Sequence, residues 1–407
     1  MLHDTKKQNS TDQIPEPDQD AKKRSLQVIE CVASACDKNN GWIRFSEYMN
    51  IALYQPAIGY YSGGLQKFGQ KGDFITAPEV SPLFAQCLAN QISEVMNNMK
   101  KASDAALGVD IIEFGAGSGI LAAELLLQMQ KLDVLPEKYF ILELTAELKY
   151  RQKETLKNKA PQLLNRVFWL DELPGSIDNA IVLANEVLDA MPVEGFSVTD
   201  NGLETLMVGF EDGRLVSRYQ SVDSSVEQTM LQIQQRSDVS FSEPYRSEYN
   251  PAIQGWLTGI EKSVNNLVIL LIDYGYNEQE YYHEDRNNGT LMCYYQHRAF
   301  DDYLRWPGLQ DITAFVNFTD VAYSAVGSGM EVSGYTTQAA FLLANGLSEL
   351  HAEQVTDDIQ QQIMLSQQIK TLTLPSEMGD RFKVMALTKN YEKPLMGFSM
   401  LDLRNRL

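Results

Sequence analysis

Three glycines at alternate positions follow an acidic residue at the end of an apolar run. The stretch from Asp110 to Gly119 reads Asp-Ile-Ile-Glu-Phe-Gly-Ala-Gly-Ser-Gly, and a helical pattern follows from Ile120 to Gln130. Glycine allows positive φ and lets a ligand approach the backbone closely. The first turn of a helix also offers unpaired N–H groups. The pattern therefore predicts a strand, a nucleotide-binding loop and a helix.

The spacing of these glycines favours S-adenosylmethionine (SAM) over a dinucleotide. A dinucleotide fingerprint has its third glycine three residues after the second, whereas Gly115, Gly117 and Gly119 alternate and Ile120 follows. SAM has no phosphate, and its ribose and aminoacyl groups need accessible backbone and a carboxylate, which Glu113 could supply. Another nucleotide ligand and a purely structural turn are the alternatives; a dehydrogenase is the least favoured.

Further polar residues follow the later predicted strands, where ligands bind in open α/β sheets. We expect strands at 110–114, 139–142, 167–169, 180–184 and 267–272, and helices at 81–99, 120–130 and 146–158. Glu143 would accept hydrogen bonds from the ribose hydroxyls, and Asp171 from the adenine amino group. The alternative for either residue is a solvated acid at a strand end.

The fourth predicted strand leads into Asn-Glu-Val-Leu-Asp-Ala-Met-Pro, residues 185–192. Asn185 is expected beside the cofactor. Glu186 and Asp189 would lie on the same side of a turn, where carboxylates can hold a guanidinium by paired hydrogen bonds or stabilise a cationic transition state. Asp273, after the fifth strand, adds an acid at this edge, and Glu186, Asp189 and Asp273 are the catalytic candidates here. The alternative for Glu186 is an acid that interacts with a helix N-terminus.

A loop rich in glycine and aromatic residues precedes the first strand, at residues 58–80. We expect it to form a lid over the cofactor, with Glu79 among the catalytic acids; aromatic packing under a cap is the alternative. The residues expected to take part are Tyr60, Tyr61, Gly72, Asp73, Phe74, Thr76, Pro78 and Glu79, of which Gly72, Asp73, Thr76 and Pro78 are predicted to bind SAM.

Composition limits the partners and the location. A net charge of −20, from 54 acidic and 34 basic residues, disfavours nucleic acid and is compatible with a basic protein partner. The four cysteines and four histidines have no metal-ligand spacing, so neither a metal site nor a disulfide framework is expected. The chain lacks an apolar run of the roughly 18 residues that span a membrane. With no signal-peptide or presequence pattern, we expect a bacterial cytoplasmic protein.

The alternation of strands and helices predicts an α/β fold with a mostly parallel sheet and helices on both faces. We expect a disordered tail at residues 1–20, an N-terminal helical lid region at 21–105 and a cofactor-binding core at 106–407. An inserted segment at about 194–262 would begin with antiparallel strands that turn at Asp212 and Gly213. The oligomeric state stays open.

Several sequence blocks together resemble the MidA-like family of SAM-dependent methyltransferases, over about residues 25–390. The blocks are Phe45-Ser-Glu-Tyr-Met49, Gly59-Tyr-Tyr61, Gly72-Asp-Phe-Ile-Thr-Ala-Pro-Glu79, Glu113-Phe-Gly-Ala-Gly-Ser-Gly119, Asn185-Glu-Val-Leu-Asp-Ala-Met-Pro192, Asp273-Tyr-Gly275 and Asp311-Ile-Thr-Ala-Phe-Val-Asn-Phe318.

This resemblance implies a class I methyltransferase (Rossmann-like) fold, SAM as methyl donor and a protein nitrogen, of the arginine type, as acceptor. Mitochondrial members include a complex I assembly factor, so a respiratory-complex subunit or another basic segment is the implied partner. Phe315 and Asn317 stand where the family commonly has His and Asp, which implies a different acceptor pocket. A small-molecule methyltransferase and a non-catalytic assembly factor are the alternatives.

Overall fold

The computed structural model describes residues 14–63, 76–102, 108–222, 224–237, 241 and 244–407. Gly72, Asp73 and Phe74, and the greater part of the expected tail, lie outside these residues. The first helix, α1 (Gln19–Lys38), begins within the expected tail because the Asp18 side chain caps it, accepting a hydrogen bond from the Ala21 N–H at 2.8 Å.

An eight-stranded sheet carries the glycine loop. Five parallel strands lie side by side, β16 runs antiparallel to β10 and β15, and β14 extends the end of β10. In spatial order the strands are β15 (Glu331–Thr337), β16 (Phe382–Lys389), β10 (Val264–Tyr276), β5 (Ile177–Asn185), β2 (Asp110–Phe114), β3 (Tyr139–Leu142) and β4 (Val167–Leu170), with β14 (Val316–Asn317) beside β10.

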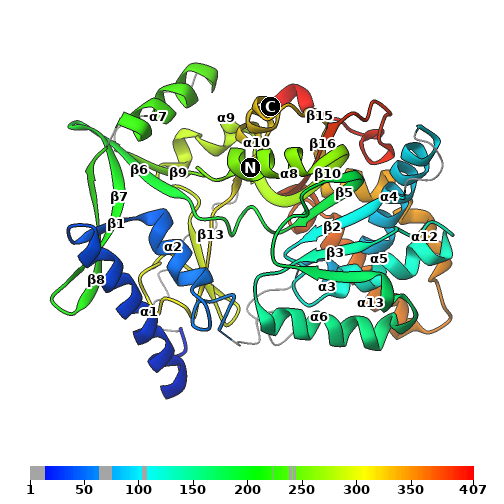
Figure 1. The fold of residues 1–407 in the computed structure, drawn as a ribbon, viewed down its shortest axis with the longest axis horizontal. Helices are drawn as coiled ribbons and strands as arrows, with labels where there is room; N and C mark the ends of the chain where they lie inside the picture. Colours follow the sequence, from blue (N-terminus) through cyan, green and yellow to red (C-terminus); the bar gives the residue numbers. More distant parts are fainter. Residues whose placement is uncertain (1–13, 64–75, 103–107, 223, 238–240, 242–243) are drawn as a thin grey trace.

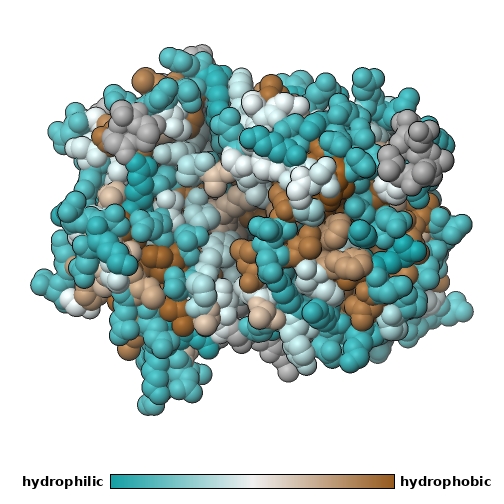
Figure 2. Space-filling view, in the orientation of Figure 1, coloured by the Kyte–Doolittle hydropathy of each residue, from teal (hydrophilic) through white to brown (hydrophobic). Residues whose placement is uncertain are grey.

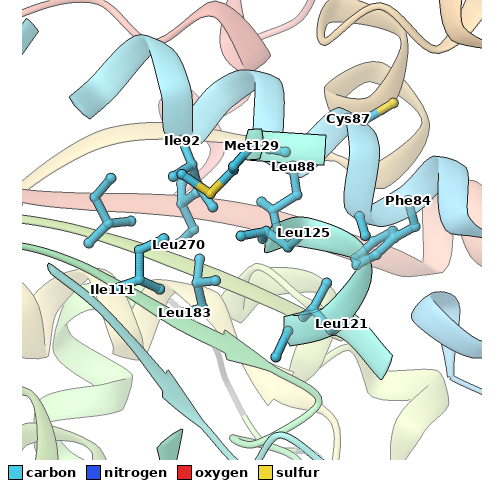
Figure 3. Packing of buried hydrophobic residues seen from close by; sticks show 14 of the residues in the cluster. Phe84, Cys87, Leu88, Ile92, Ile111, Leu121, Leu125, Met129, Leu183 and Leu270 are labelled. Carbon is cyan, nitrogen blue, oxygen red and sulfur yellow. The ribbon is translucent and has the colours of Figure 1, made fainter. Parts of the chain in front are cut away.

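Helices cover both faces of this sheet, as the sequence predicted, because alternate strand residues point to opposite sides. Leu270 packs on one side and Ile269 on the other. The first side has α4 (Pro82–Ala102), α5 (Ile120–Lys131), α6 (Ala146–Lys159), α11 (Gln338–Ala344), α12 (Leu347–Glu353) and α13 (Ile359–Thr373); the second has α8 (Ile253–Ser263) and α10 (Phe318–Gly327). Figure 3 shows Leu88 and Leu125 packed between α4, α5 and the sheet.

The N-terminal region and the inserted segment form one unit rather than two. A five-stranded antiparallel sheet joins β1 (Trp42–Arg44), from the N-terminal region, to the inserted β7 (Gly202–Glu211). The helices α1 and α2 (Phe45–Tyr54) share its apolar core, and this unit lies beside the main sheet in Figure 1. The other inserted elements are β6 (Glu194–Thr199), β8 (Arg214–Ser221), α7 (Ser224–Ser237) and β9 (Tyr245–Tyr249).

The antiparallel hairpin is present, with Asp212 and Gly213 at positive φ between β7 and β8. The insertion is shorter than expected, however, because α8 packs in the apolar core of the main sheet. A hydrogen bond also joins α2 to the inserted segment: Ser46, in the first turn of the helix, donates its hydroxyl to the Glu194 carboxylate at 2.5 Å.

A second segment that leaves the main sheet, which we call the second excursion, was not predicted from the sequence. After β10 the chain forms α9 (Glu278–Tyr281) and a small sheet of β11 (Met292–Tyr295), β12 (Arg298–Phe300) and β13 (Asp311–Thr313). Cys293 and Ile312 of this sheet are buried against the N-terminal unit. Two short helices, α3 (Ala77–Val80) and α14 (Met378–Arg381), contribute residues to the cavity described below.

The face drawn in Figure 2 is mostly hydrophilic, with apolar side chains gathered near its centre. This distribution agrees with a chain that carries a net charge of −20. Within the described residues, no helix is both long and apolar enough to span a bilayer.

The contact between β10 and β14 requires a glycine. A Cβ atom on Gly275 would lie 2.1 Å from the carbonyl oxygen of Val316, so Gly275→Ala must displace β14. We expect this change to lower the free energy of unfolding by about 1–3 kcal/mol in urea titrations. The control is Gly255→Ala in α8, where a Cβ meets no atom within 4 Å; it should raise stability by about 0.5–1 kcal/mol. Equal stability of the two variants would contradict the close packing.

Candidate active site

A cavity of about 450 Å³ opens where β2, β3 and β5 end. One part of its wall is the glycine loop and the end of β3; another contains carboxylates and aromatic rings from distant segments. The lining residues that bear on the chemistry are Tyr54, Tyr61, Thr76, Pro78, Glu79, Glu113, Gly115, Gly117, Ser118, Glu143, Leu144, Leu148, Asn185, Glu186, Asp189, Tyr274, Tyr294, Asp311, Thr313, Phe315 and Arg381.

The glycine loop adopts the backbone conformation that its sequence predicted. Gly115, Gly117 and Gly119 have φ values of 60°, 51° and 81°. A Cβ atom on Gly119 would lie 2.9 Å from the Cα atom of Gln152, so glycine lets α5 start against α6. Gly119 therefore serves helix packing and is not among the residues that line the cavity, whereas Gly115 and Gly117 are.

Glu143 lies at the end of β3 with its carboxylate on the cavity wall. Its Oε1 atom accepts from the Thr145 N–H at 3.0 Å and the Thr145 hydroxyl at 3.1 Å, and its Oε2 atom accepts from the Gln152 amide at 3.0 Å. A carboxylate has about four acceptor positions, so it retains capacity for a ribose hydroxyl. Leu144, 71% exposed, and Leu148 offer apolar surface for a base beside it.

Gln152 was not predicted from the sequence, although its side chain hydrogen-bonds to several parts of the cavity wall. Its amide nitrogen also donates to the carbonyl of Gly117 at 3.1 Å, and its oxygen accepts from the Trp169 indole at 2.9 Å. One buried side chain thus links the glycine loop, Glu143 and β4. Nothing in the sequence marks a glutamine in the middle of a helix for this role.

Glu113 is buried behind the glycine loop and lines the cavity. The Tyr139 hydroxyl donates to its Oε2 atom at 2.8 Å. Burial raises the pKa of Glu113 to about 7; the Tyr139 hydrogen bond opposes this, and the charge of Glu143 adds to it. The carboxyl group therefore sits where the sequence predicted an acceptor for the cofactor.

Asp171 does not reach the cavity, contrary to the prediction of an adenine contact. Its side chain is 84% exposed and forms an ion pair with Lys149 of α6. The physical reason is that β4 is the edge strand of the sheet, so the residue after it faces solvent.

The turn after β5 presents the predicted acids. Glu186 has φ = 53°, in the left-handed region that non-glycine residues adopt uncommonly. The Asn185 amide donates to its Oε1 atom at 3.3 Å. Burial, followed by the charge of Asp189, raises the pKa of Glu186 to about 8. The acid is therefore mostly protonated at neutral pH when no cation faces it.

Asp189 is 6% exposed and also lines the cavity. The Tyr274 hydroxyl donates to its Oδ2 atom, while its Oδ1 atom is buried and has no hydrogen-bond partner within the described structure. Burial raises the pKa of Asp189 to about 6, and the Tyr274 hydrogen bond opposes the rise. A buried oxygen without a donor is costly, which points to a donor on a bound ligand.

Asp273 supports this turn and does not line the cavity, so it does not occupy the catalytic position expected for it. It is fully buried in β10. Its Oδ2 atom accepts from the N–H groups of Leu188 at 3.0 Å and Asp189 at 3.3 Å, and Oδ1 accepts from the N–H of Tyr274 at 2.9 Å. Because its hydrogen bonds go to the backbone, we describe Asp273 as a positioning residue.

The described part of the expected lid borders the cavity. Thr76, Pro78 and Glu79 line it, and the Ser118 hydroxyl of the glycine loop donates to Glu79. The Glu79 carboxylate therefore lies against the glycine loop. Tyr61 also lines the cavity, whereas Tyr60 is fully buried in the core of the N-terminal unit.

Five further wall residues come from the N-terminal unit and the second excursion: Tyr54, Tyr294, Asp311, Thr313 and Phe315. Asp311 and Phe315 lie in a block that carries the family resemblance, which was a usable signal for them, whereas Tyr54 had none. Asn317 of the same block lies elsewhere: it caps α10, and its amide donates to Glu278 at 3.0 Å.

This fold and this cavity define a SAM-dependent methyltransferase. A family model for S-adenosyl-L-methionine-dependent methyltransferases matches residues 87–336. The chain belongs to this family, and its resemblance to MidA-like proteins is confirmed. The cofactor is SAM, and Glu143 with the glycine loop fits its ribose and aminoacyl groups. Among the described residues, no group of three His, Cys, Asp or Glu side chains could hold a metal ion.

Solved structures and curated proteins agree with this assignment. A Burkholderia thailandensis crystal structure with bound S-adenosyl-homocysteine is 38% identical, with a TM-score of 0.89 over 97% of this chain and 100% of that chain. The mitochondrial protein arginine methyltransferase NDUFAF7 of Danio rerio is 27% identical over 89% of this chain and 90% of its own length. Its Drosophila melanogaster homolog is 27% identical over 89% and 86%.

Gly117→Val should weaken SAM binding, because a β-branched residue is strained at φ = 51° and Gly117 lines the cavity. We expect isothermal titration to show at least about a 10-fold loss of affinity. The matched control is Gly213→Val, at φ = 78° in a hairpin turn where a Cβ meets no atom within 4 Å. Unchanged SAM affinity in Gly117→Val would contradict the placement.

The raised pKa of Glu186 predicts a pH dependence of stability. The unfolded chain ionises this group above its ordinary pKa of 4.5, whereas the folded protein keeps it protonated up to about 8. The folded state thus binds more protons in this window, so rising pH lowers the free energy of unfolding. Glu186→Gln should reduce the fall by up to about 1.4 kcal/mol per pH unit, less what solvent in the cavity screens.

Urea titrations between pH 5 and pH 8 measure this difference. The control variant is Glu172→Gln, which removes an exposed carboxyl and should keep the slope of the wild-type protein. Identical slopes for Glu186→Gln and the wild-type protein would rule out the shifted ionisation.

Proposed function

We propose that this methyltransferase transfers the methyl group of SAM to a side-chain nitrogen of arginine in a protein substrate. The observation that carries the proposal is the buried Oδ1 atom of Asp189, which lines the cavity and has no hydrogen-bond donor among the described residues. A guanidinium carries five N–H donors in one plane and matches carboxylates at two edges. The curated relatives named as protein arginine methyltransferases add support.

The acids of the cavity suit a cationic acceptor. Glu186 and Asp189 are carried on one turn, and each has its pKa raised mainly by burial. A bound guanidinium would favour the ionised carboxylates, so binding would release protons near neutral pH. The two carboxylates would then hold the acceptor by charge-assisted hydrogen bonds.

The contribution of the protein to the reaction is mainly orientation. SAM supplies a methyl group on a positively charged sulfur. The carboxylates would align one acceptor nitrogen with that methyl group. Because the acceptor would already be held in this orientation, less entropy would be lost on reaching the transition state. The new N–C bond would form as the S–C bond of the donor breaks, with S-adenosylhomocysteine as the leaving group, and one N–H proton of the acceptor would pass to a carboxylate of the turn or to solvent. The negative charge of the carboxylates would also offset the positive charge on the nitrogen in the transition state.

The test is methyl transfer from isotope-labelled SAM to proteins of a bacterial lysate, followed by hydrolysis and mass spectrometry for methylarginine. Glu186→Gln should reduce the yield by about 10- to 100-fold, because it removes one charge-assisted hydrogen-bond partner. SAM affinity should be retained. The control is Glu172→Gln, which makes the same carboxylate-to-amide change at an exposed residue and should keep full activity.

Two other results would overturn this proposal. A labelled product of low molecular mass, with unlabelled proteins, would indicate a small-molecule acceptor. SAM binding without any transfer would indicate an assembly factor that binds a partner. A bacterial cytoplasmic location stays a prediction, which cell fractionation would test.

A further inference from the structure

We infer that Asp311 is a second carboxylate anchor for the acceptor and determines the preference for a guanidinium over an ammonium group. This inference rests on the proposed function and adds a residue to it. Asp311 is the first residue of β13, and it pairs with Tyr294 of β11. It is 2% exposed and lines the same cavity as Glu186.

A tyrosine from the N-terminal unit holds the Asp311 carboxylate in place. The Tyr61 hydroxyl lies 3.0 Å from Oδ1 and 3.0 Å from Oδ2, so it donates between the two oxygens. The Tyr61 ring stacks on Tyr54, with centroids 5.4 Å apart and planes 18° apart. The carboxylate orientation is thus set by a pair of packed rings that themselves line the cavity.

The same elements fix Asp311 relative to the turn that carries Glu186 and Asp189. The Tyr54 hydroxyl donates to the carbonyl of Ala190 at 2.9 Å. The N–H of Ala314, three residues after Asp311, donates to the carbonyl of Asp189 at 3.0 Å. Two independent hydrogen bonds therefore join the turn to both supports of Asp311, and a ligand would meet the carboxylates in a fixed relation.

Acids outnumber basic residues in the described part of the cavity wall. Of the described residues that line it, six are acids and Arg381, which is exposed, is the one basic residue. The charge of Asp311 contributes to the raised pKa of Glu186, after burial and Asp189. Buried carboxylates are costly unless cations or donors compensate them, and the Oδ1 atom of Asp189 has no donor in the described structure.

Two carboxylates from different elements discriminate between cations by geometry. A guanidinium has donors on several edges of one plane, so it would bind Asp311 and the Glu186 turn through different edges. An ammonium group is a compact point charge without this fork. Tyr54 and Tyr61 add aromatic surface, on which guanidinium groups stack well.

The experiment measures binding of N-acetyl-arginine amide and N-acetyl-lysine amide to the full-length protein loaded with S-adenosylhomocysteine, by ligand-observed NMR at pH 8. The wild-type protein should prefer the arginine probe. Asp311→Asn should weaken arginine binding by about 10-fold or more, the loss of a charged hydrogen-bond partner, and should reduce the preference over lysine. SAM affinity should be retained.

The control is Asp301→Asn, which removes the same charge from an exposed residue outside the cavity wall and should leave both probes unaffected. Tyr61→Phe keeps the Asp311 carboxylate and removes only its hydroxyl donor. It should weaken arginine binding by about 2- to 10-fold, and it carries the test if Asp311→Asn fails to bind SAM.

The outcomes separate this inference from the proposed function. Wild-type arginine affinity in both Asp311→Asn and Tyr61→Phe, with a loss in Glu186→Gln, would overturn the role of Asp311 and leave the proposed function standing. A wild-type protein that binds SAM but shows no preference for the arginine probe would overturn both.

Discussion

The site depends on one turn, residues 186–190, that three distant parts of the chain hold in place. Asp273 of the main sheet accepts the N–H groups of Leu188 and Asp189. Tyr54 of the N-terminal unit and Ala314 of the second excursion donate to carbonyls of the same turn. These contacts hold Glu186 in a left-handed conformation, and such strain persists only where the surroundings determine it fully.

This constraint explains why the N-terminal unit and the second excursion pack against each other instead of forming separate domains. The N-terminal strand β1 pairs with the inserted β7, and the small sheet packs on the same apolar core. The additions thereby form one body that faces the end of the main sheet. The main sheet supplies the glycine loop and Glu143 to the cavity wall, and this body supplies Tyr54, Tyr61 and Asp311.

The two sides of the cavity differ in how far the sequence predicted them. Glu113, the glycine loop and Glu143 were predicted because each lies within a few residues of a strand end, where local pattern determines position. The same reasoning gave a wrong prediction for Asp171. A local sequence pattern does not reveal that β4 is an edge strand or that Lys149 forms an ion pair with this acid. Asp273 was placed at the correct edge, yet its carboxylate turns to the backbone beneath the site.

The sequence by itself determined the class of cofactor and the alternation of strands and helices along the main sheet, since both follow from short contiguous motifs and local patterns. The tertiary structure alone decided which distant residues meet in the rest of the cavity wall. Tyr61 and Asp311 stand 250 residues apart and meet through hydrogen bonds, and it is folding that buries the Oδ1 atom of Asp189 without a donor among the described residues. No local periodicity encodes such contacts, because they arise when separate elements pack against one another.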